Sequence, residues 1–197
     1  MKKQSETPQF EFTIIAGTLK GRRITAPDLG ITRPPLSRLR KSIFDFLKPY
    51  LEDARYLDLF SGTGSYLFES VSRGVATAVG VELHPALAAA INAQAGQFNI
   101  ADRLRCLEAD VRWAVPSLAD TGEQFDIIMV APPQYQGWID RTLEIIRRTT
   151  IATPDTLILC QHDTSEVKHL RLEGFEILQR RKYGNTTFTA MRMEKRG

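Results

Sequence analysis

The stretch Leu57-Asp58-Leu59-Phe60-Ser61-Gly62-Thr63-Gly64 joins a short apolar run to a glycine-rich turn. The apolar run predicts a strand that is buried on both faces, as the strands of parallel sheets are. Glycine in the turn permits positive φ and lets a ligand approach the backbone closely. Residues 65–73 then predict a helix that ends at Gly74. This order of elements is typical of α/β folds that bind a ligand at the first turn.

Strand-like and helix-like runs alternate along the rest of the chain. Such repetition predicts a Rossmann-like α/β fold with a mostly parallel sheet and right-handed crossovers. Two last runs separated by Gly184-Asn185 add a C-terminal antiparallel hairpin. We expect strands over 56–60, 78–82, 104–107, 125–130, 156–160, 175–183 and 186–193, and helices over 85–98, 111–118, 138–148 and 165–171.

The N-terminal part has a different pattern. Residues 1–10 suggest a disordered leader, and the β-rich runs 12–16 and 22–26 suggest a hairpin. A loop and a helix over 36–51, with Ser37 as a candidate N-cap, follow. We therefore divide the chain into an N-terminal β-hairpin extension, residues 1–30, and a larger domain, residues 31–197.

Positive charge is concentrated at the same end. Residues 1–48 carry ten Lys and Arg against four Asp and Glu, a net charge of +6, whereas the remaining 149 residues carry sixteen against nineteen, a net charge of −3. This asymmetry suggests that the basic end meets a polyanion. A basic face that is merely solvated explains the charge equally well.

Composition excludes several other classes. No apolar run approaches the roughly 20 residues of a membrane helix, and the N-terminus lacks the apolar core of a signal peptide. Cys106 and Cys160 lie in apolar runs and form neither a disulfide framework nor a zinc site. We expect buried, inert thiols, no metal and a reducing cytoplasmic location.

Acidic residues lie within, at the end of or just after the first three predicted strands of the larger domain. Asp58 lies just before the glycine turn, where dinucleotide-binding folds usually carry an apolar residue. Glu82 ends the second strand, where an acid can bind both ribose hydroxyls, and Asp110 is placed to accept from an adenine amino group. Glu82 or Asp110 alone fits a helix N-cap or a solvated acid better, but together the acids predict a cofactor site. Leu67 replaces the third glycine of a dinucleotide fingerprint, which disfavours a Rossmann dehydrogenase.

The strand predicted over 125–130 ends abruptly in Ala131-Pro132-Pro133-Gln134-Tyr135. The two prolines cannot continue the strand, because each fixes φ and lacks an N–H for the ladder. Ligands of open α/β sheets bind just outside the carboxyl ends of the strands. We therefore expect this turn to take part in chemistry.

With these motifs the chain resembles the class I S-adenosylmethionine-dependent methyltransferases. It is more closely similar to the bacterial-type family that methylates a guanine N2 in small-subunit ribosomal RNA. The similarity extends from about residue 13 to residue 193, and the N-terminal motifs are more specific than the glycine turn. The motifs are Ile14-Ile15-Ala16-Gly17-Thr18-Leu19-Lys20-Gly21-Arg22, Thr32-Arg33-Pro34, Arg38-Leu39-Arg40-Lys41-Ser42-Ile43-Phe44 and Leu57–Gly64.

The resemblance implies that S-adenosyl-L-methionine is the cofactor and that ribosomal RNA is the substrate. The residues with which the family binds the methionine end of the cofactor correspond to Asp58, Phe60, Gly62 and Gly64 in this sequence. Those for the ribose and the adenine match Glu82, Asp110 and Val111. Arg33 and Pro34 are implied to close over the cofactor or the target nucleotide, and RNA contacts are implied for Lys20, Arg22, Arg23 and Arg38.

The same resemblance assigns catalysis to the turn, at Ala131, Pro132, Pro133 and Tyr135. Enzymes of this kind carry Asp or Asn, two prolines and an aromatic residue, which together position the amine and stack on a flipped base. Here Ala131 replaces the acid or amide, and Gln134 precedes the aromatic Tyr135. Backbone carbonyls or Gln134 supply the missing acceptor, or else the chain is a slow or inactive member.

The preferred interpretation is a monomeric guanine-N2 methyltransferase that acts on small-subunit ribosomal RNA, in an assembling subunit, without metal or membrane. Two alternatives stay open. One is a cofactor-binding RNA module that no longer methylates, which the residue at position 131 suggests. The other is a methyltransferase for a small molecule or a protein, which would not need the basic N-terminal extension.

Overall fold

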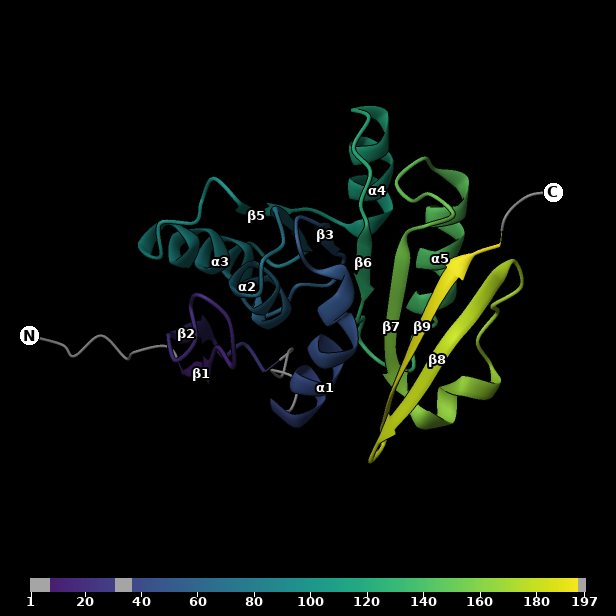
Figure 1. Cartoon of the computed structure of the whole chain (residues 1–197), viewed down its shortest axis with the longest axis horizontal. Helices are drawn as coiled ribbons and strands as arrows, with labels where there is room; N and C mark the ends of the chain where they lie inside the picture. Colours follow the sequence, from purple (N-terminus) through teal and green to yellow (C-terminus); the bar gives the residue numbers. More distant parts are fainter. Residues whose placement is uncertain (1–7, 31–36, 195–197) are drawn as a thin grey trace, which may run out of the picture.

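The computed structural model describes residues 8–30 and 37–194, which form an α/β fold around a seven-stranded sheet (Figure 1). The order of the strands is β5-β4-β3-β6-β7-β9-β8. The first five are parallel, and β9 pairs antiparallel with both β7 and β8. The predicted fold class and the closing hairpin are therefore confirmed. The strands are β3 Arg55–Asp58, β4 Thr77–Glu82, β5 Leu104–Glu108, β6 Ile127–Val130, β7 Leu157–Asp163, β8 Phe175–Tyr183 and β9 Thr186–Met193.

Helices cover both faces of the sheet and enclose two apolar cores. One core lies between the sheet and α1 Ser37–Leu47, α2 Ser65–Ser72 and α3 Pro85–Gln97. The other lies between the sheet and α4 Val111–Asp120 and α5 Trp138–Arg148. Two 3₁₀ turns, η1 Lys48–Tyr50 and η2 Thr164–Lys168, follow α1 and β7.

The two cores explain why the central strands are continuously apolar. All four residues of β6 are buried, because alternate side chains point to opposite faces and both faces are covered. Ile127 and Met129 belong to the core beneath α1–α3, whereas Ile128 and Val130 belong to the core beneath α4 and α5. Alternate residues of a strand therefore pack into opposite cores.

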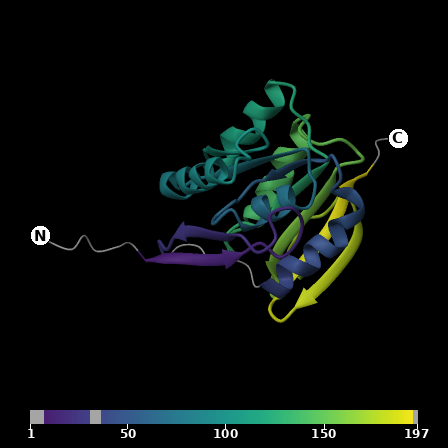
Figure 2. The same cartoon turned by 60° about the vertical axis from the view of Figure 1, so that its left-hand side comes forward.

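The N-terminal residues form a separate two-stranded antiparallel sheet, which projects beside α3 (Figure 2). Its strands are β1 Gln9–Thr13 and β2 Arg23–Pro27, paired from Gln9↔Pro27 to Thr13↔Arg23. The predicted first strand over 12–16 was thus wrong by three residues, and Gln9 and Phe10 belong to a strand rather than to a leader. Residues 1–7 lie outside the described range.

The shift has a physical reason in the segment 14–21, which docks on the end of α2 instead of continuing the strand. The backbone N of Thr18 donates to the carbonyl of Ser72 at 2.7 Å. Gly17 has a φ of +87°, and a Cβ placed on it would lie 1.7 Å from the same carbonyl oxygen. Only glycine allows this approach, so the glycine of the motif serves docking.

The hairpin and the larger domain share one core. Phe12, Ile14, Leu19 and Ile24 are buried in the same cluster as side chains of α1, α2 and α3. The boundary at residue 30 stays a prediction, and this shared core means that the segment before it is not packed as an independent unit.

Candidate active site

Four neighbouring strands bring one residue each to the carboxyl edge of the sheet, on the face that α1–α3 cover. Across the sheet they are Glu82 at the end of β4, Asp58 at the end of β3, Ala131 directly after β6 and Gln161 within β7. The pairings Asp58↔Gly80, Asp58↔Met129 and Val130↔Cys160 set their alignment. Since side chains alternate along a strand, all four lie on the same face.

Asp58 is the most deeply enclosed of these residues, with an exposed fraction of 0%. Its Oδ1 accepts a hydrogen bond from the backbone N of Phe60 at 3.3 Å, and its Oδ2 has no partner among the described residues. Burial raises the pKa of this carboxyl to about 7, and the charge of Glu82 acts in the same direction. A cationic ligand would therefore find an unpaired oxygen and would stabilise the ionised form.

Glu82 holds the glycine turn in place. Its Oε2 accepts from the backbone N of Gly62 at 2.7 Å, and its Oε1 accepts from the backbone N of His84 at 2.8 Å. Each carboxylate oxygen can accept a further hydrogen bond, and the side chain is only half-buried. The acid thus stays available to hydroxyl donors after it has shaped the turn.

The turn itself depends on Gly62 and Gly64, whose φ values are +51° and +77°. A Cβ on Gly64 would lie 2.8 Å from Cγ1 of Ile91, so this position has neither the conformation nor the space for a side chain. The first backbone N–H groups of α2 have no acceptor within the helix, as at any helix start.

Asp110 is the N-cap of α4, and its Oδ1 accepts from the backbone N of Arg112 at 2.8 Å. The guanidinium of Arg112 also binds both oxygens, at 3.0 and 2.7 Å, and holds the pKa of Asp110 below its ordinary value. The carboxylate is therefore shared with Arg112, and its contact with an adenine stays a prediction. Val111 is buried in the core beneath α4.

Phe60 lies half-buried beside the turn and packs edge to face on Trp138, with ring centroids 6.2 Å apart. The guanidinium groups of Arg112 and Arg141 lie 5.8 and 5.3 Å from the Trp138 ring centroid. This cluster connects the first turns of α4 and α5 and places aromatic rings beside the glycine turn.

The proline turn starts at the middle of the edge. Ala131 is half-buried, Pro132 is buried and Pro133 is exposed. Tyr135 is 67% exposed and has a φ of +63°, a conformation that non-glycine residues rarely adopt. Its backbone N donates to Oε1 of Glu166 at 3.0 Å, so η2 supports the turn. An exposed tyrosine at this place has a free ring face for a planar partner.

The predicted RNA-binding residues lie at different ends of the molecule. Helices α1 and α2 run in the same direction, since Arg40 pairs with Glu69 and Asp45 with Arg73. Arg38, exposed in the first turn of α1, therefore lies toward the active edge.

The other basic candidates lie away from that edge or in a surface pair. Lys20 belongs to the loop that docks on the end of α2, and Arg22 stacks on Phe98 after the end of α3, so both lie at the opposite edge. Arg23 forms an exposed ion pair with Glu11. Arg33 and Pro34 lie outside the described residues.

A protein-family model described as "Conserved hypothetical protein 95" matches residues 12–192. The chain belongs to this family. Membership confirms the resemblance that the motifs indicate, and it covers both the N-terminal hairpin and the closing one.

Relatives and solved structures agree with this membership. Ribosomal RNA small subunit methyltransferase D of Escherichia coli (strain K12) is 28% identical over 163 residues, which cover 83% of this chain and 80% of the relative. The structure of a putative methyltransferase from Escherichia coli has a TM-score of 0.82 at 22% identity, over 95% of this chain and 100% of that one. An RNA methyltransferase from Salinibacter ruber, in complex with S-adenosyl-L-homocysteine, has a TM-score of 0.65 at 13% identity, over 84% and 96%. The fold is that of class I methyltransferases.

The site of this Conserved hypothetical protein 95 member fits a cationic nucleoside cofactor on its own chemistry. Asp58 offers a buried, unpaired oxygen, Glu82 has acceptor capacity left, and the glycine turn leads into a helix start whose first N–H groups have no acceptor within the helix. Gln161 was missed by the sequence prediction, because only the register of β6 and β7 places it beside Ala131.

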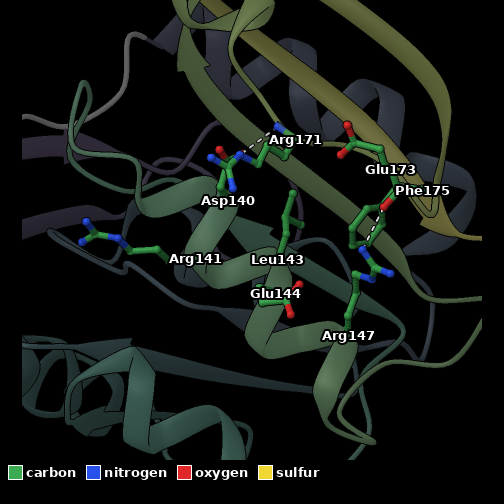
Figure 3. A pocket seen from close by; sticks show the side chains of 8 residues that line it. All are labelled: Asp140, Arg141, Leu143, Glu144, Arg147, Arg171, Glu173 and Phe175. Atoms are coloured by element: carbon green, nitrogen blue, oxygen red, sulfur yellow. Dashed lines mark hydrogen bonds between the residues drawn. The ribbon is translucent and has the colours of Figure 1, made fainter.

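A hollow of about 320 Å³ lies elsewhere, between α5 and the segment that leads into β8 (Figure 3). Asp140 and Arg147 of α5 line it, and their hydrogen bonds to the backbone of Arg171 and Glu173 close its ends. None of the predicted site residues that fall within the described ranges lines this hollow. Within residues 8–30 and 37–194, no group of three metal-ligating side chains gathers, and no helix has the length and apolar character of a membrane span.

Proposed function

We propose that this protein transfers a methyl group from S-adenosyl-L-methionine to the exocyclic N2 of a guanine in small-subunit ribosomal RNA. The observation that carries the proposal is the row of residues across one edge of a class I methyltransferase sheet. The row begins with Glu82, which can accept from hydroxyl groups, and continues with the buried Asp58, which suits a cationic group. The proline turn with the exposed Tyr135 comes next, at the same edge of the sheet. The name of the Escherichia coli relative supports ribosomal RNA as the substrate.

Asp58, Glu82 and the turn from Phe60 to Gly64 would hold the cofactor. When it is bound, S-adenosyl-L-methionine supplies an electrophilic methyl group on a positively charged sulfur. The carboxylate of Asp58 would favour the cationic end of the ligand, and Glu82 would accept from ribose hydroxyls. Asp110 and Val111 would form the adenine end, with the guanidinium of Arg112 sharing the Asp110 carboxylate.

The proline turn would present the target amine. Its backbone carbonyls are fixed by the two prolines, and the ring of Tyr135 is exposed for stacking on a base that has left its helix. Oriented in this way, a weak nucleophile reacts faster because its approach to the methyl group is already arranged.

The RNA would approach the active edge over Arg38, while Lys20, Arg22 and Arg23 would contact phosphates farther away. We propose a monomer that acts in the cytoplasm on an assembling subunit, where the target guanine is still accessible. The opposite placement of Arg38 and Lys20 supports an extended RNA surface rather than a single contact.

Transfer of a labelled methyl group tests the proposal. Small subunits from cells that lack the protein should accept the label from S-adenosyl-L-methionine, whereas large subunits should not. Calorimetry should show cofactor binding that Asp58→Ala and Glu82→Ala weaken. Binding of NAD without any response to the methyl donor would contradict the proposal.

Ala131 favours a second candidate, a cofactor-binding RNA module that does not methylate, because its side chain cannot accept a hydrogen bond. In that case wild-type protein would bind both cofactor and RNA without transfer, and Ala131→Asp would create activity. Any transfer by the wild-type protein excludes this candidate.

A further inference from the structure

The position beside Ala131 is occupied by a residue that can accept a hydrogen bond. Val130 and Cys160 are partners in the parallel ladder of β6 and β7, so the next residues, Ala131 and Gln161, are neighbours across the two strands. Adjacent strands lie about 4.8 Å apart. Ala131 packs against the core beneath α1–α3, and Gln161 is paired with Phe188 of that same core. Both side chains therefore leave the sheet on the same face.

The amide of Gln161 is held in a defined orientation. The hydroxyl of Tyr66, in the first turn of α2, donates to Oε1 of Gln161 at 2.5 Å. Tyr66 is 5% exposed, whereas Gln161 is half-buried and still reaches the surface of the edge. An amide oxygen has two lone pairs, so Oε1 keeps one acceptor position after it has bound the tyrosine.

Tyr66 also links this amide to the cofactor side of the edge. Tyr66 is the second residue of α2, the helix that begins directly after the glycine turn. Its hydroxyl thus connects the helix that follows the glycine turn to the amide in β7. The proline turn starts between β3 and β7.

We propose that Gln161 is the side-chain acceptor for the target amine, in place of the acid or amide that is absent at position 131. This inference rests on the proposed function, methyl transfer to an amino group. A methyl side chain at position 131 would leave room above β6 for the amine, within reach of the longer glutamine side chain on the next strand. The substitution at 131 is in this account compensated rather than inactivating.

The chemistry needs an acceptor and not a base. The nitrogen lone pair forms the new N–C bond while the S–C bond breaks, and the electron pair of that bond stays on sulfur, which becomes a neutral thioether. The nitrogen carries one positive charge until it loses a proton to water. Gln161 would hold one N–H of the amine in the attacking orientation, and the backbone carbonyls of the turn would hold the other. Tyr66 is then a positioning residue, because it acts through Gln161.

Kinetics of methyl transfer test the assignment. Gln161→Ala should lower kcat on the order of 10²–10³-fold, the usual effect of losing one positioned hydrogen bond in a transition state, with an unchanged Kd for S-adenosyl-L-methionine. Gln161→Glu keeps an acceptor and should stay within about tenfold of wild type, and Tyr66→Phe should lose about tenfold in kcat but not in KM. Gln124→Ala, a matched change of an exposed glutamine before β6, should leave kcat unchanged.

Rescue separates chemistry from folding. Ala131→Asp in the Gln161→Ala background should restore at least about tenfold of the lost kcat, because it returns an acceptor to the same face. Wild-type kcat in Gln161→Ala would overturn the assignment while leaving the proposed function intact. A wild-type protein without any transfer to guanine N2 would overturn both.

Binding gives a readout that is independent of turnover. Small subunits reconstituted with guanine or with inosine at the mapped target position differ only in the 2-amino group. With S-adenosyl-L-homocysteine present, wild-type protein should bind the guanine form at least about fivefold more tightly, because inosine leaves the Gln161 oxygen unpaired. Gln161→Ala should bind both forms equally. Undiminished discrimination in that variant would assign the contact to another group and overturn the inference.

Discussion

Asp58 is a carboxyl group that the fold keeps away from water without giving both of its oxygens a partner. One oxygen accepts a single backbone hydrogen bond, and the other has none among the described residues. Burial of this kind disfavours the charged form and raises the pKa, here to about 7. Without a ligand, the buried carboxylate therefore lowers the free energy of unfolding at neutral pH. A bound cationic ligand would offset this cost.

The first prediction concerns stability. Because the folded pKa of Asp58 lies above its unfolded value, folded protein binds the proton more tightly, and the free energy of unfolding falls as pH rises from about 4 to about 7. A shift from 3.8 to about 7 corresponds to roughly 4 kcal/mol. Asp58→Asn should match wild type near pH 4 and exceed its stability at pH 8. Urea unfolding of both proteins, without cofactor, measures the difference, and a pH-independent difference would refute the raised pKa.

The second prediction concerns binding. A cationic cofactor prefers the ionised carboxylate, and the competent fraction of Asp58 falls about tenfold between pH 8 and pH 6 when the pKa is about 7. The Kd of wild-type protein for S-adenosyl-L-methionine should therefore rise by roughly tenfold over that range. Asp58→Asn should bind more weakly and with less pH dependence in calorimetry. Equal pH dependence in both proteins would place the titrating group elsewhere.

Single residues also show how far the sequence carries the site. Asp58, Glu82 and the glycines could be predicted because each stands at a fixed distance from a strand end or a turn that the sequence itself marks. Gln161 could not, since its place depends on the register between two strands about thirty residues apart. The engagement of Asp110 by Arg112 was likewise invisible, because it depends on a side-chain conformation.

At the scale of elements, an ion pair fastens the N-terminal hairpin to α1 and α2. Arg40 and Glu69 are each 1% exposed, with Nε and Oε2 3.6 Å apart. Glu69 also accepts from the backbone N of Ile15 and of Ala16, and Arg40 Nη2 donates to the carbonyl of Thr13 at 2.7 Å. Three segments of the chain thus meet at two buried charges, and desolvation makes each charge dependent on the other.

The third prediction follows from this pair. Glu69→Gln leaves the guanidinium of Arg40 buried without a counter-charge, which should lower the free energy of unfolding by about 3–5 kcal/mol. Glu144→Gln, which removes the exposed partner of Arg148 in α5, should change it by less than about 1 kcal/mol. Urea unfolding compares the two, and hydrogen exchange should show faster opening at Ile15 and Ala16 in Glu69→Gln only. Equal effects of both variants would contradict the fastening role.

The element boundaries show why the hairpin was the least predictable segment. Helix α5 was predicted correctly because its apolar spacing is set within one continuous stretch. The run 12–16 has strand-like composition, but residues 14–16 leave the strand to bind α2. The strand ends early because these residues contact a helix more than fifty residues away in the sequence, and the local sequence pattern contains no sign of that contact.

At the scale of the whole molecule, the basic residues are spread over both edges of the sheet. Arg38 lies toward the active edge, and Lys20 and Arg22 lie at the opposite edge, beyond the length of α2. Attraction between these charges and phosphates is long-range and salt-dependent. An RNA that contacts all of them must therefore extend along the face that carries the hairpin.

The fourth prediction tests that surface by charge reversal, since deletion of the hairpin would remove part of the core. Arg38→Glu should weaken RNA binding and lower transfer, and Lys20→Glu with Arg22→Glu should mainly weaken binding. In a plot of the logarithm of the binding constant against the logarithm of the salt concentration, each lost phosphate contact should make the negative slope shallower by about 1. Arg148→Glu, an exposed change at the end of α5, serves as the control. RNA affinity equal to the control in all variants would exclude this face.

The proposed methyl transfer has one chemical product, N2-methylguanosine. Small subunits from cells that lack the protein are treated with it and with methyl-labelled S-adenosyl-L-methionine, the RNA is digested to nucleosides, and the labelled nucleoside is identified by mass spectrometry. We expect the label to appear as N2-methylguanosine at one position of the small-subunit RNA. Absence of label from the RNA, or its recovery in a different nucleoside, would contradict the proposed methyl transfer.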